Sequence, residues 1–298
     1  MTNPPLRIGT RASALARWQA ERVRDLLAAR GVAAELVAIT TSGDEGARPR
    51  PAGVPGKGTF TKEIEDALLG GRVDLAVHSL KDLWVEPPAG LVLAAVPERE
   101  DPRDALVGPP GVGLADLPPG ARIGTSSLRR RYALLAARPD LEVVTLRGNV
   151  PTRVRRVDDG TVHAAVLALA GLRRLGLAGR ALALHPDIVL PAAGQGAIAI
   201  EARDGDRATL NAVLPLESRD LRLAVDAERA ALAALGAGCN VPIGALCEAA
   251  HGDQVLTVAV YASDGRSPMV ARVAVRGDPV AAGREAAAEL RRQGADGR

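Results

Sequence analysis

The octapeptide AVHSLKDL, residues 76–83, ends an apolar run with two opposite charges, Lys81 and Asp82. We read the run as a buried strand in which adjacent side chains point to opposite faces, so the two charges are not expected to pair with each other. A carboxylate at the end of a buried strand can act as a general acid or base, or stabilise a developing cation. A helix-capping aspartate is the alternative for Asp82, and we expect His78 to be structural.

Two further segments, IGTRAS (8–13) and IGTSSLRR (123–130), share a pattern suited to anion binding. Both put small hydroxyl residues at a predicted helix start, where free backbone N–H groups and the helix dipole attract anions. Arg11 in the first segment, and Arg129 and Arg130 in the second, complete predicted carboxylate or phosphate clamps, because a guanidinium binds such groups bidentately. For either motif alone, ordinary helix capping with solvated arginines is the alternative.

The middle of the chain holds further arginines that could bind anions. LRGNVPTRVRR (146–156) offers Arg147 and Arg153, and GLRRLG (171–176) offers Arg173 and Arg174, one expected as a ligand and the other in solvent. Residues 121–180 hold twelve arginines, no lysine and four acidic residues, a balance that indicates an anionic partner. A solvated surface in an arginine-rich chain is the competing interpretation.

The composition favours small anions over nucleic acid as that partner. Aromatic residues make up 2% of the chain, which leaves almost no platform for stacking single-stranded bases, and no DNA-binding signature is present. We therefore expect carboxylates or phosphates of small molecules, and no nucleic acid.

The two cysteines differ in context. GAGCNVPIG sets Cys239 in a glycine-rich turn, where an exposed thiolate is a nucleophile, although burial is the commoner fate of a free cysteine and is what we expect for Cys247. Two cysteines are too few for a disulfide scaffold, and the four histidines lack metal-ligand spacing. We expect no bound metal.

Apolar runs alternate with helical periodicity, which is typical of an α/β protein. We expect a first α/β domain from residues 1–97 and 197–214, with AIAIEA (197–202) as a strand that rejoins the first sheet. A crossover in PEREDPRDALVG (97–108) leads to a second α/β domain, 102–191, and a small α+β domain follows at 218–298. The glycine- and proline-rich segment 42–59 is expected to be a lid or a disordered segment.

The location of the protein is predicted from what the sequence lacks. No apolar stretch is long enough to span a bilayer, and the first ten residues do not form the apolar segment of a secretory signal. We expect a cytoplasmic protein that makes no membrane contact.

Nine motifs in order closely resemble the porphobilinogen deaminase family, also called hydroxymethylbilane synthase: GTRAS, GKGTFTKE, AVHSLKD, EREDPRDA, GTSSLRR, LRGNV, AGLRRLG, LPAAGQGA and GAGCNVPIG. The resemblance runs from Leu6 to about Cys247. It implies two doubly wound domains like those of periplasmic binding proteins, and a small third domain that carries Cys239. It also implies a transferase of tetrapyrrole and haem biosynthesis, which condenses four porphobilinogens head to tail into hydroxymethylbilane and releases ammonia.

The same resemblance implies roles for individual residues. Asp82 matches the catalytic aspartate, and Cys239 matches the cysteine that holds a dipyrromethane cofactor through a thioether. Further cofactor-binding positions match Lys81, Thr125, Ser127, Arg129 and Arg130. Substrate-binding positions match Arg11, Ser13, Arg147, Arg153 and Arg174. Lys57 and Phe60 match the lid, and the expected partner is porphobilinogen, bound by a monomer.

The lid region departs from the family pattern. Gly53 stands where the family often has a second lysine, and Thr59 and Thr61 replace commoner apolar residues around Phe60. Two other interpretations stay open. A non-enzymatic, two-lobed binding protein for small organic anions would need neither Asp82 nor Cys239. A nucleic-acid-binding protein would lose affinity steeply as salt is raised.

Overall fold

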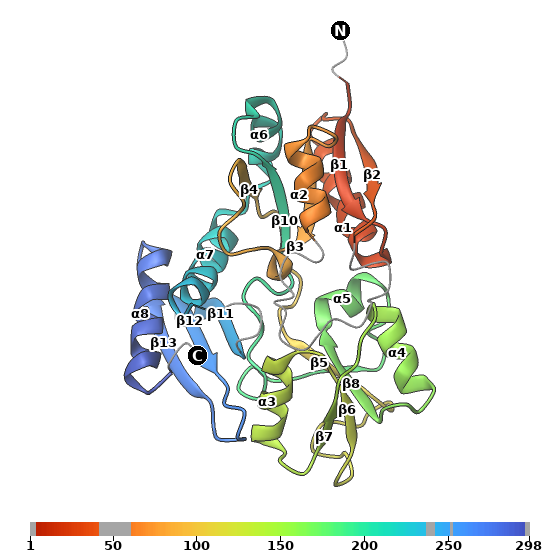
Figure 1. The fold of residues 1–298 in the computed structure, drawn as a ribbon, viewed down its shortest axis with the longest axis vertical. Coiled ribbons are helices and arrows are strands. Elements are labelled where there is room, and N and C mark those ends of the chain that lie inside the picture. Colours follow the sequence, from red (N-terminus) through yellow and green to blue (C-terminus); the bar gives the residue numbers. More distant parts are fainter. Residues whose placement is uncertain (1–3, 42–60, 237–241, 251–252, 296–298) are drawn as a thin grey trace. The chain divides into compact units, whose positions relative to one another are not determined.

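The computed structural model describes residues 4–41, 61–236, 242–250 and 253–295 (Figure 1). The chain divides into two compact units, each of two segments. The first unit comprises residues 1–99 and 197–222, and the second comprises residues 100–196 and 223–298. The division into three domains predicted from the sequence stays a prediction. The expected second domain, and the expected third domain from residue 223 onward, fall within the second unit.

The first unit is built on a five-stranded sheet in the order β2-β1-β3-β10-β4. Strand β1 runs parallel to β2 and β3, and β10 runs antiparallel to β3 and β4. The strands are β1 (Leu6–Arg11), β2 (Ala34–Ile39), β3 (Leu75–Ser79), β4 (Leu91–Ala95) and β10 (Ile198–Arg203). The helices are α1 (Ala14–Ala28), α2 (Lys62–Leu69), η1 (Leu80–Asp82), α6 (Arg207–Val213) and η2 (Leu214–Leu216).

Helices cover both faces of this sheet, as in a doubly wound fold. Ala20, Val23 and Leu27 of α1 pack with Leu75 and Val77 on one face. On the other face, an apolar side of α2 packs against Ala76 in a cluster of Ile39, Ile64, Ala67, Leu68, Val73, Ala76 and Leu91. Because side chains alternate along β3, its odd-numbered residues face α1 and its even-numbered residues face α2.

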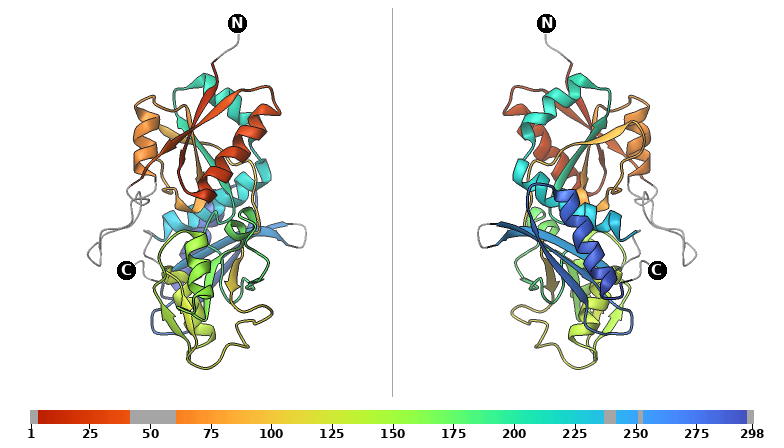
Figure 2. Two further views of the ribbon diagram at one scale, coloured as in Figure 1. Left: turned by 90° about the vertical axis from the view of Figure 1, so that its right-hand side faces the viewer. Right: turned by 90° about the vertical axis from the view of Figure 1, so that its left-hand side faces the viewer.

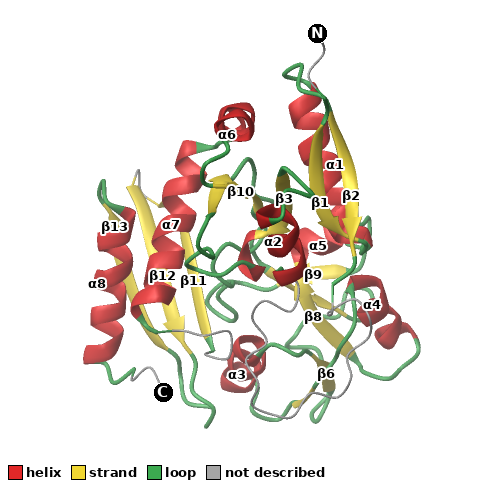
Figure 3. Cartoon of the chain, turned by 45° about the horizontal axis from the view of Figure 1, so that its top comes forward, coloured by secondary structure: helices red, strands yellow, loops and turns green. Residues whose placement is uncertain are grey.

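The second unit contains a sheet of the same topology, in the order β7-β6-β8-β5-β9. Strand β6 is parallel to β7 and β8, and β5 is antiparallel to β8 and β9. The strands are β5 (Asp104–Val107), β6 (Arg122–Gly124), β7 (Glu142–Val144), β8 (Ala164–Ala168) and β9 (Ala181–Ala183). The helices are α3 (Leu128–Ala137), α4 (Val150–Asp158) and α5 (Leu169–Arg174) (Figure 3).

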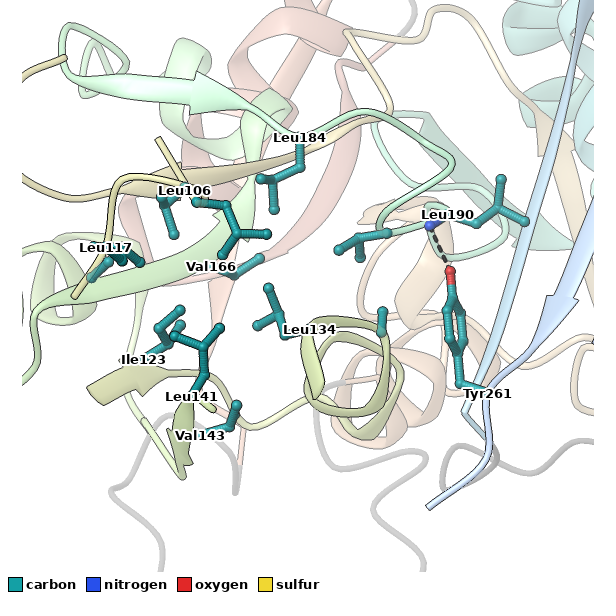
Figure 4. Close-up of a cluster of buried hydrophobic side chains, with 14 of the residues drawn as sticks. Leu106, Leu117, Ile123, Leu134, Leu141, Val143, Val166, Leu184, Leu190 and Tyr261 are labelled. Carbon is teal, nitrogen blue, oxygen red and sulfur yellow. Dashed lines mark hydrogen bonds between the residues drawn. The ribbon is translucent and has the colours of Figure 1, made fainter. Parts of the chain in front are cut away.

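Two apolar clusters line the two faces of this second sheet. Figure 4 shows one of them, in which Leu134 of α3 packs with Ile123, Val143 and Val166. The other lies under α4 and α5 and includes Leu169 and Leu172. The chain passes from the first unit to the second between residues 99 and 100, inside the predicted crossover 97–108. The same segment also holds a strand that was not predicted: Asp104–Val107 is the buried strand β5, which fills the same place in its sheet as β10 does in the first.

The third sheet is a three-stranded antiparallel meander, β11-β12-β13. Its elements are α7 (Arg219–Ala234), β11 (Ile243–Ala250), β12 (Asp253–Val260), β13 (Met269–Val275) and α8 (Pro279–Arg292). Alanines of α7 and α8 pack in one cluster with Leu256 and Val258 of the sheet, and Figure 2 shows α8 lying along the strands. The α+β character predicted for this part of the chain is confirmed.

Candidate active site

The turn after β3 presents Asp82. The strand ends at Ser79, and Leu80, Lys81 and Asp82 form one turn of 3₁₀ helix. Leu80 is buried and its N–H donates to the carbonyl of Ala197, 3.0 Å away, which fixes the turn to the segment leading into β10. Asp82 is exposed.

The expectation that Lys81 and Asp82 extend a strand and point to opposite faces is therefore wrong. The hydrogen-bonded register of β3 with β10 runs out at Ser79, and the chain leaves the sheet there. The 3₁₀ turn, with about three residues per turn, now sets the directions of the two side chains.

A cavity of about 70 Å³ lies beside this turn, at the carboxyl ends of β1 and β3. It brings together three of the predicted site residues, Arg11, Ser13 and Asp82. The other residues that line it are Leu15, Ala16, Gln19, Thr61, Val77, His78 and Ser79. A carboxylate and a guanidinium thus share one small polar cavity within the first unit.

The start of α1 has the predicted capping geometry. Ser13 is the N-cap residue, and its Oγ accepts a hydrogen bond from the N–H of Ala16 at 3.4 Å. Gln19 is buried one turn further on, and its Nε2 donates to Ser79 Oγ at 3.0 Å. This hydrogen bond ties α1 to the end of β3. Sequence reasoning did not single out Gln19 or Ser79, although both lie in or beside quoted motifs.

The start of α3 repeats the arrangement in the second unit. Ser127 is the N-cap residue and accepts from the N–H of Arg130 at 3.4 Å. Thr125 is buried, and its hydroxyl oxygen accepts from the N–H of Ser127 at 3.2 Å. Both predicted hydroxyl residues therefore order the turn that begins the helix.

Arg129 and Arg130 are themselves buried, and each is paired with Asp104 of β5. Arg129 Nη1 lies 2.7 Å from Asp104 Oδ2, and Arg130 Nη2 lies 2.7 Å from Asp104 Oδ1. Gln195 Nε2 adds a third donor to the carboxylate, at 2.9 Å from Oδ1. Burial alone would raise the pKa of Asp104, but the two guanidinium charges and their hydrogen bonds outweigh it and hold the pKa far below its usual range.

Asp104 is a residue that the sequence interpretation missed. The acidic, proline-containing stretch around it obscured a short apolar run, ALV, that completes β5. One carboxylate facing two guanidiniums leaves the buried group with a net positive charge, which suits a nearby anion. Whether Arg129 and Arg130 contact such an anion stays a prediction.

The other predicted arginines lie at three places in the second unit. Arg147 is exposed in the segment between β7 and α4, and Arg153 is half-buried on α4. Arg174 ends α5, and its Nη2 donates to the carbonyl of Gly196 at 2.8 Å. Its neighbour Arg173 is paired with Glu100 at 2.8 Å.

A buried carboxylate also links the second and third sheets. Glu228 of α7 is fully buried and accepts from the N–H of Gly194 at 2.6 Å and from the N–H of Cys247 at 2.9 Å. Tyr261 adds a second link, because its hydroxyl accepts from the N–H of Leu190 at 2.8 Å (Figure 4). Cys247 is buried on β11.

Cys239, Lys57 and Phe60 lie outside the described residues, as do Gly53 and Thr59. Their predicted roles stay predictions. Among the residues that the structure describes, no group of three or more metal-binding side chains is found, and no helix is long and apolar enough to cross a membrane.

The two five-stranded sheets of one topology, with helices on their faces, define an α/β protein in which the helix starts at Ser13 and Ser127 have arginines as close neighbours in the sequence. Residues 6–211 match the sequence model of "Porphobilinogen deaminase, dipyromethane cofactor binding domain", and residues 222–292 match that of the C-terminal domain of the same family. The chain belongs to the porphobilinogen deaminase family.

Curated relatives are similar in sequence to this protein along nearly the whole chain. A porphobilinogen deaminase of Syntrophotalea carbinolica is 52% identical over 87% of this chain and 82% of its own length. One of Roseiflexus sp. is 50% identical over 96% of both chains, and one of Moorella thermoacetica is 48% identical over 97% of this chain and 94% of its own.

Among solved structures, the chain is similar to a nutrient-binding protein from Burkholderia cenocepacia bound to methionine, with a TM-score of 0.45 and 16% identity over 72% of this chain and 93% of the other. It is also similar to the periplasmic VFT2 domain of BvgS from Bordetella pertussis, with a TM-score of 0.44 and 18% identity over 77% of this chain and 92% of that domain.

Proposed function

We propose that the protein condenses four porphobilinogen molecules head to tail into hydroxymethylbilane, as its family does. Each addition breaks the bond between the aminomethyl carbon and nitrogen of one porphobilinogen, releases ammonia and forms a carbon–carbon bond to the terminal pyrrole α-carbon of the growing chain, which loses its proton. Water supplies the hydroxyl group when the finished tetrapyrrole is released. The observation that carries this proposal is the exposed Asp82 carboxylate in one cavity with Arg11 and Ser13, in a chain that belongs to the family along most of its length.

Asp82 is the proposed catalytic residue. Loss of ammonia leaves an azafulvene whose positive charge is shared with the pyrrole nitrogen. A fixed carboxylate accepts the pyrrole N–H and stabilises that cation, and it needs little reorganisation because the 3₁₀ turn already holds it at the cavity.

The arginines are the proposed ligands of the substrate's acid groups. Each pyrrole carries an acetate and a propionate, so a growing chain of rings is a dense polyanion. Arg11, Ser13, Arg147, Arg153 and Arg174 are the proposed substrate-binding residues. A charge-assisted hydrogen bond of this kind contributes roughly 1.5–3 kcal/mol, so several of them hold a chain that makes few apolar contacts.

The dipyrromethane cofactor is proposed to be attached to Cys239 through a thioether. The donor set fits its acid tails, because Lys81, Thr125, Ser127, Arg129 and Arg130 supply two hydroxyls and three cations. Asp104 leaves room for such an acid group, because its single negative charge balances only one of the two buried guanidiniums. When bound, the cofactor supplies the pyrrole end to which the first substrate is added. Lys57 and Phe60 are proposed for the lid.

The mass of the intact, denatured protein tests this proposal. We expect a species heavier than the polypeptide by one dipyrromethane. The Cys239→Ser variant should lose the added mass and the turnover of porphobilinogen, whereas Cys247→Ser is the matched control and should keep both. Active protein of bare polypeptide mass would contradict the proposal.

The remaining proposals concern the state of the protein. We propose a cytoplasmic monomer with three domains, at 1–97 with 197–214, 102–191 and 218–298. Light scattering tests the monomer, and limited proteolysis near residues 97–102 and 214–218 tests the domain boundaries. The deaminase reaction is preferred to plain anion binding because the curated relatives, which this chain matches along nearly their whole length, are named porphobilinogen deaminases.

A further inference from the structure

Three buried titratable side chains meet beneath α2. His78 of β3, Glu201 of β10 and Glu65 of α2 are 5%, 2% and 6% exposed. His78 Nε2 lies 3.2 Å from Glu201 Oε2, which is an ion-pair distance. None of the three was assigned a chemical role by the sequence, and the proposed reaction does not use them.

The strand register explains why they meet. Glu201 is paired with Ala76, and Ala76 lies on the face of the sheet that α2 covers. His78 is two residues further along β3, so its side chain points to the same face. Glu65 is buried on the inner side of α2, next to Ile64 and Leu68 of the apolar cluster on that face.

The charges of these three buried side chains balance only if two of the three groups carry a proton. Two ionised carboxylates beside a neutral imidazole would bury two negative charges, and unpaired buried charges are costly. Two cations on this face are already engaged, since Arg7 is paired with Asp74 and Arg203 with Asp206. An imidazolium paired with Glu201, together with a neutral Glu65, leaves no net charge.

Hydrogen bonding leads to the same assignment. Glu65 Oε1 is buried and accepts no hydrogen bond from any residue that the structure describes, whereas Glu201 Oε2 lies 3.2 Å from His78 Nε2. A buried carboxylate oxygen without a donor favours the protonated acid. Burial raises the pKa of Glu65, and Glu201 and Asp66 raise it further, whereas the nearby Thr61 hydroxyl and the charge of His78 act in the opposite direction.

The cluster adjoins the candidate active site. His78 and Thr61 line the same cavity as Asp82. His78 also directly precedes Ser79, the last residue of β3. After Ser79 the chain leaves the sheet and forms the η1 turn that presents Asp82. A rigid contact between β3, β10 and α2 at this point fixes the base of that turn.

We propose that His78, Glu201 and Glu65 form a buried proton-sharing cluster, in which a protonated Glu65 lies beside a His78–Glu201 ion pair, and that the cluster positions Asp82. The three are positioning residues that act through the η1 turn. The positioning role rests on the function proposed above for Asp82, whereas the protonation of Glu65 does not.

The first test measures stability alone. Urea unfolding of wild type and Glu65→Gln is compared between pH 5 and 9, with the same change at an exposed carboxylate of β7, Glu142→Gln, as the matched control. A folded-state pKa above the unfolded value means that wild-type stability is lost as the pH rises through the folded pKa. The ratio of the folding constants, Glu65→Gln over wild type, should therefore increase with pH, by at most about tenfold per pH unit.

The control ratio, Glu142→Gln over wild type, should stay flat across the same range. A flat ratio for Glu65→Gln would show that Glu65 is ionised in the folded protein, and a variant that fails to fold at pH 6 would show that the amide cannot replace the carboxyl group. Either result would overturn the assignment. This arm needs no substrate and no cofactor, so it stands even where the proposed function fails.

The second test measures catalysis by the loaded enzyme. Glu201→Gln removes the partner of His78, and we expect kcat to fall at least tenfold while KM changes less than threefold, with a shifted pH profile of kcat. The double variant His78→Gln/Glu201→Gln, which removes both charges, should fold at least as well as Glu201→Gln. Unchanged kcat and an unchanged pH profile in Glu201→Gln would overturn the positioning role.

Discussion

Arg130 holds Asp104 through two hydrogen bonds to one oxygen: its Nε lies 3.0 Å and its Nη2 2.7 Å from Oδ1. Arg129 binds the other oxygen of the same carboxylate. The strand β5 is thereby joined to the first turn of α3 by charge as well as by packing. The contact fixes the helix start at which Thr125 and Ser127 lie.

Replacing Asp104 with Asn should be severely destabilising. Two buried guanidiniums would lose their counter-ion, which typically costs about 3–5 kcal/mol in the free energy of unfolding. Urea denaturation at pH 7 measures the loss. The surface variant Asp140→Asn, which removes the exposed partner of Arg138, is the control and should cost far less, because an exposed ion pair is screened by solvent.

The pH dependence of the same pair gives an independent check. The pKa of Asp104 is depressed in the folded protein, so its contribution is fully present above the unfolded value, near 3.9, and is lost as the pH falls through the folded value. The difference in unfolding free energy between wild type and Asp104→Asn should be constant from pH 7 to about pH 5 and shrink only in stronger acid. A difference that shrinks between pH 7 and 5 would contradict the ion pair.

Asp82→Asn should separate catalysis from folding. The side chain is exposed, so the unfolding free energy should change by less than about 0.5 kcal/mol. Loss of the charge that stabilises the azafulvene should lower kcat by about 10²–10³-fold. Measurement of porphobilinogen consumption, together with the intact mass, checks both points, and normal turnover would remove Asp82 from the mechanism.

Arg173 and Arg174 form a natural matched pair, since they are adjacent on α5 but differ in their contacts. Arg173 is occupied by Glu100 and Asp101, whereas Arg174 is the proposed substrate ligand. Arg174→Ala should lower kcat/KM by about 10–150-fold, which corresponds to the 1.5–3 kcal/mol of a hydrogen bond to a charged group. Arg173→Ala should change it less than threefold, and equal losses in the two variants would refute the assignment.

Gly283 should not tolerate even a methyl group. A Cβ at this position of α8 would lie 2.6 Å from Ala230 Cβ and 2.6 Å from the backbone nitrogen of Ala231, both on α7. Gly283→Ala should therefore destabilise by about 1–3 kcal/mol, although Ala is the better helix former. Gly179→Ala, where a Cβ would meet no atom within 4 Å, is the control in thermal or urea unfolding.

Much of the fold could be predicted from the sequence because its signals are local. The helix expected over 14–29 is observed at Ala14–Ala28, since Ser13 caps it and Gly31 follows in a left-handed conformation. AIAIEA was predicted to rejoin the first sheet, and β10 does so. The strand β5 was missed because four buried residues between prolines and charges carry no periodic pattern.

The site was predicted unevenly for a related reason. Arg11, Ser13 and Asp82 could be found because each lies in a short motif, and the cavity brings them together. The partner of Arg129 and Arg130 could not be found, because Asp104 lies 25 and 26 residues earlier and only the tertiary fold joins them. Glu65 and Glu201 could not be connected with His78 for the same reason, because they lie on two other elements and only the tertiary fold brings them near it.

The order of strands has a consequence for how the chain emerges from the ribosome. The strand β10 lies between β3 and β4, yet it is made about a hundred residues after them. At a synthesis rate of roughly 5–20 residues per second, the facing edges of β3 and β4 wait for about 5 to 20 s without their central neighbour. Nascent chains that stall before residue 198 should therefore bind chaperones that recognise unpaired strand edges, and those released after residue 203 should not.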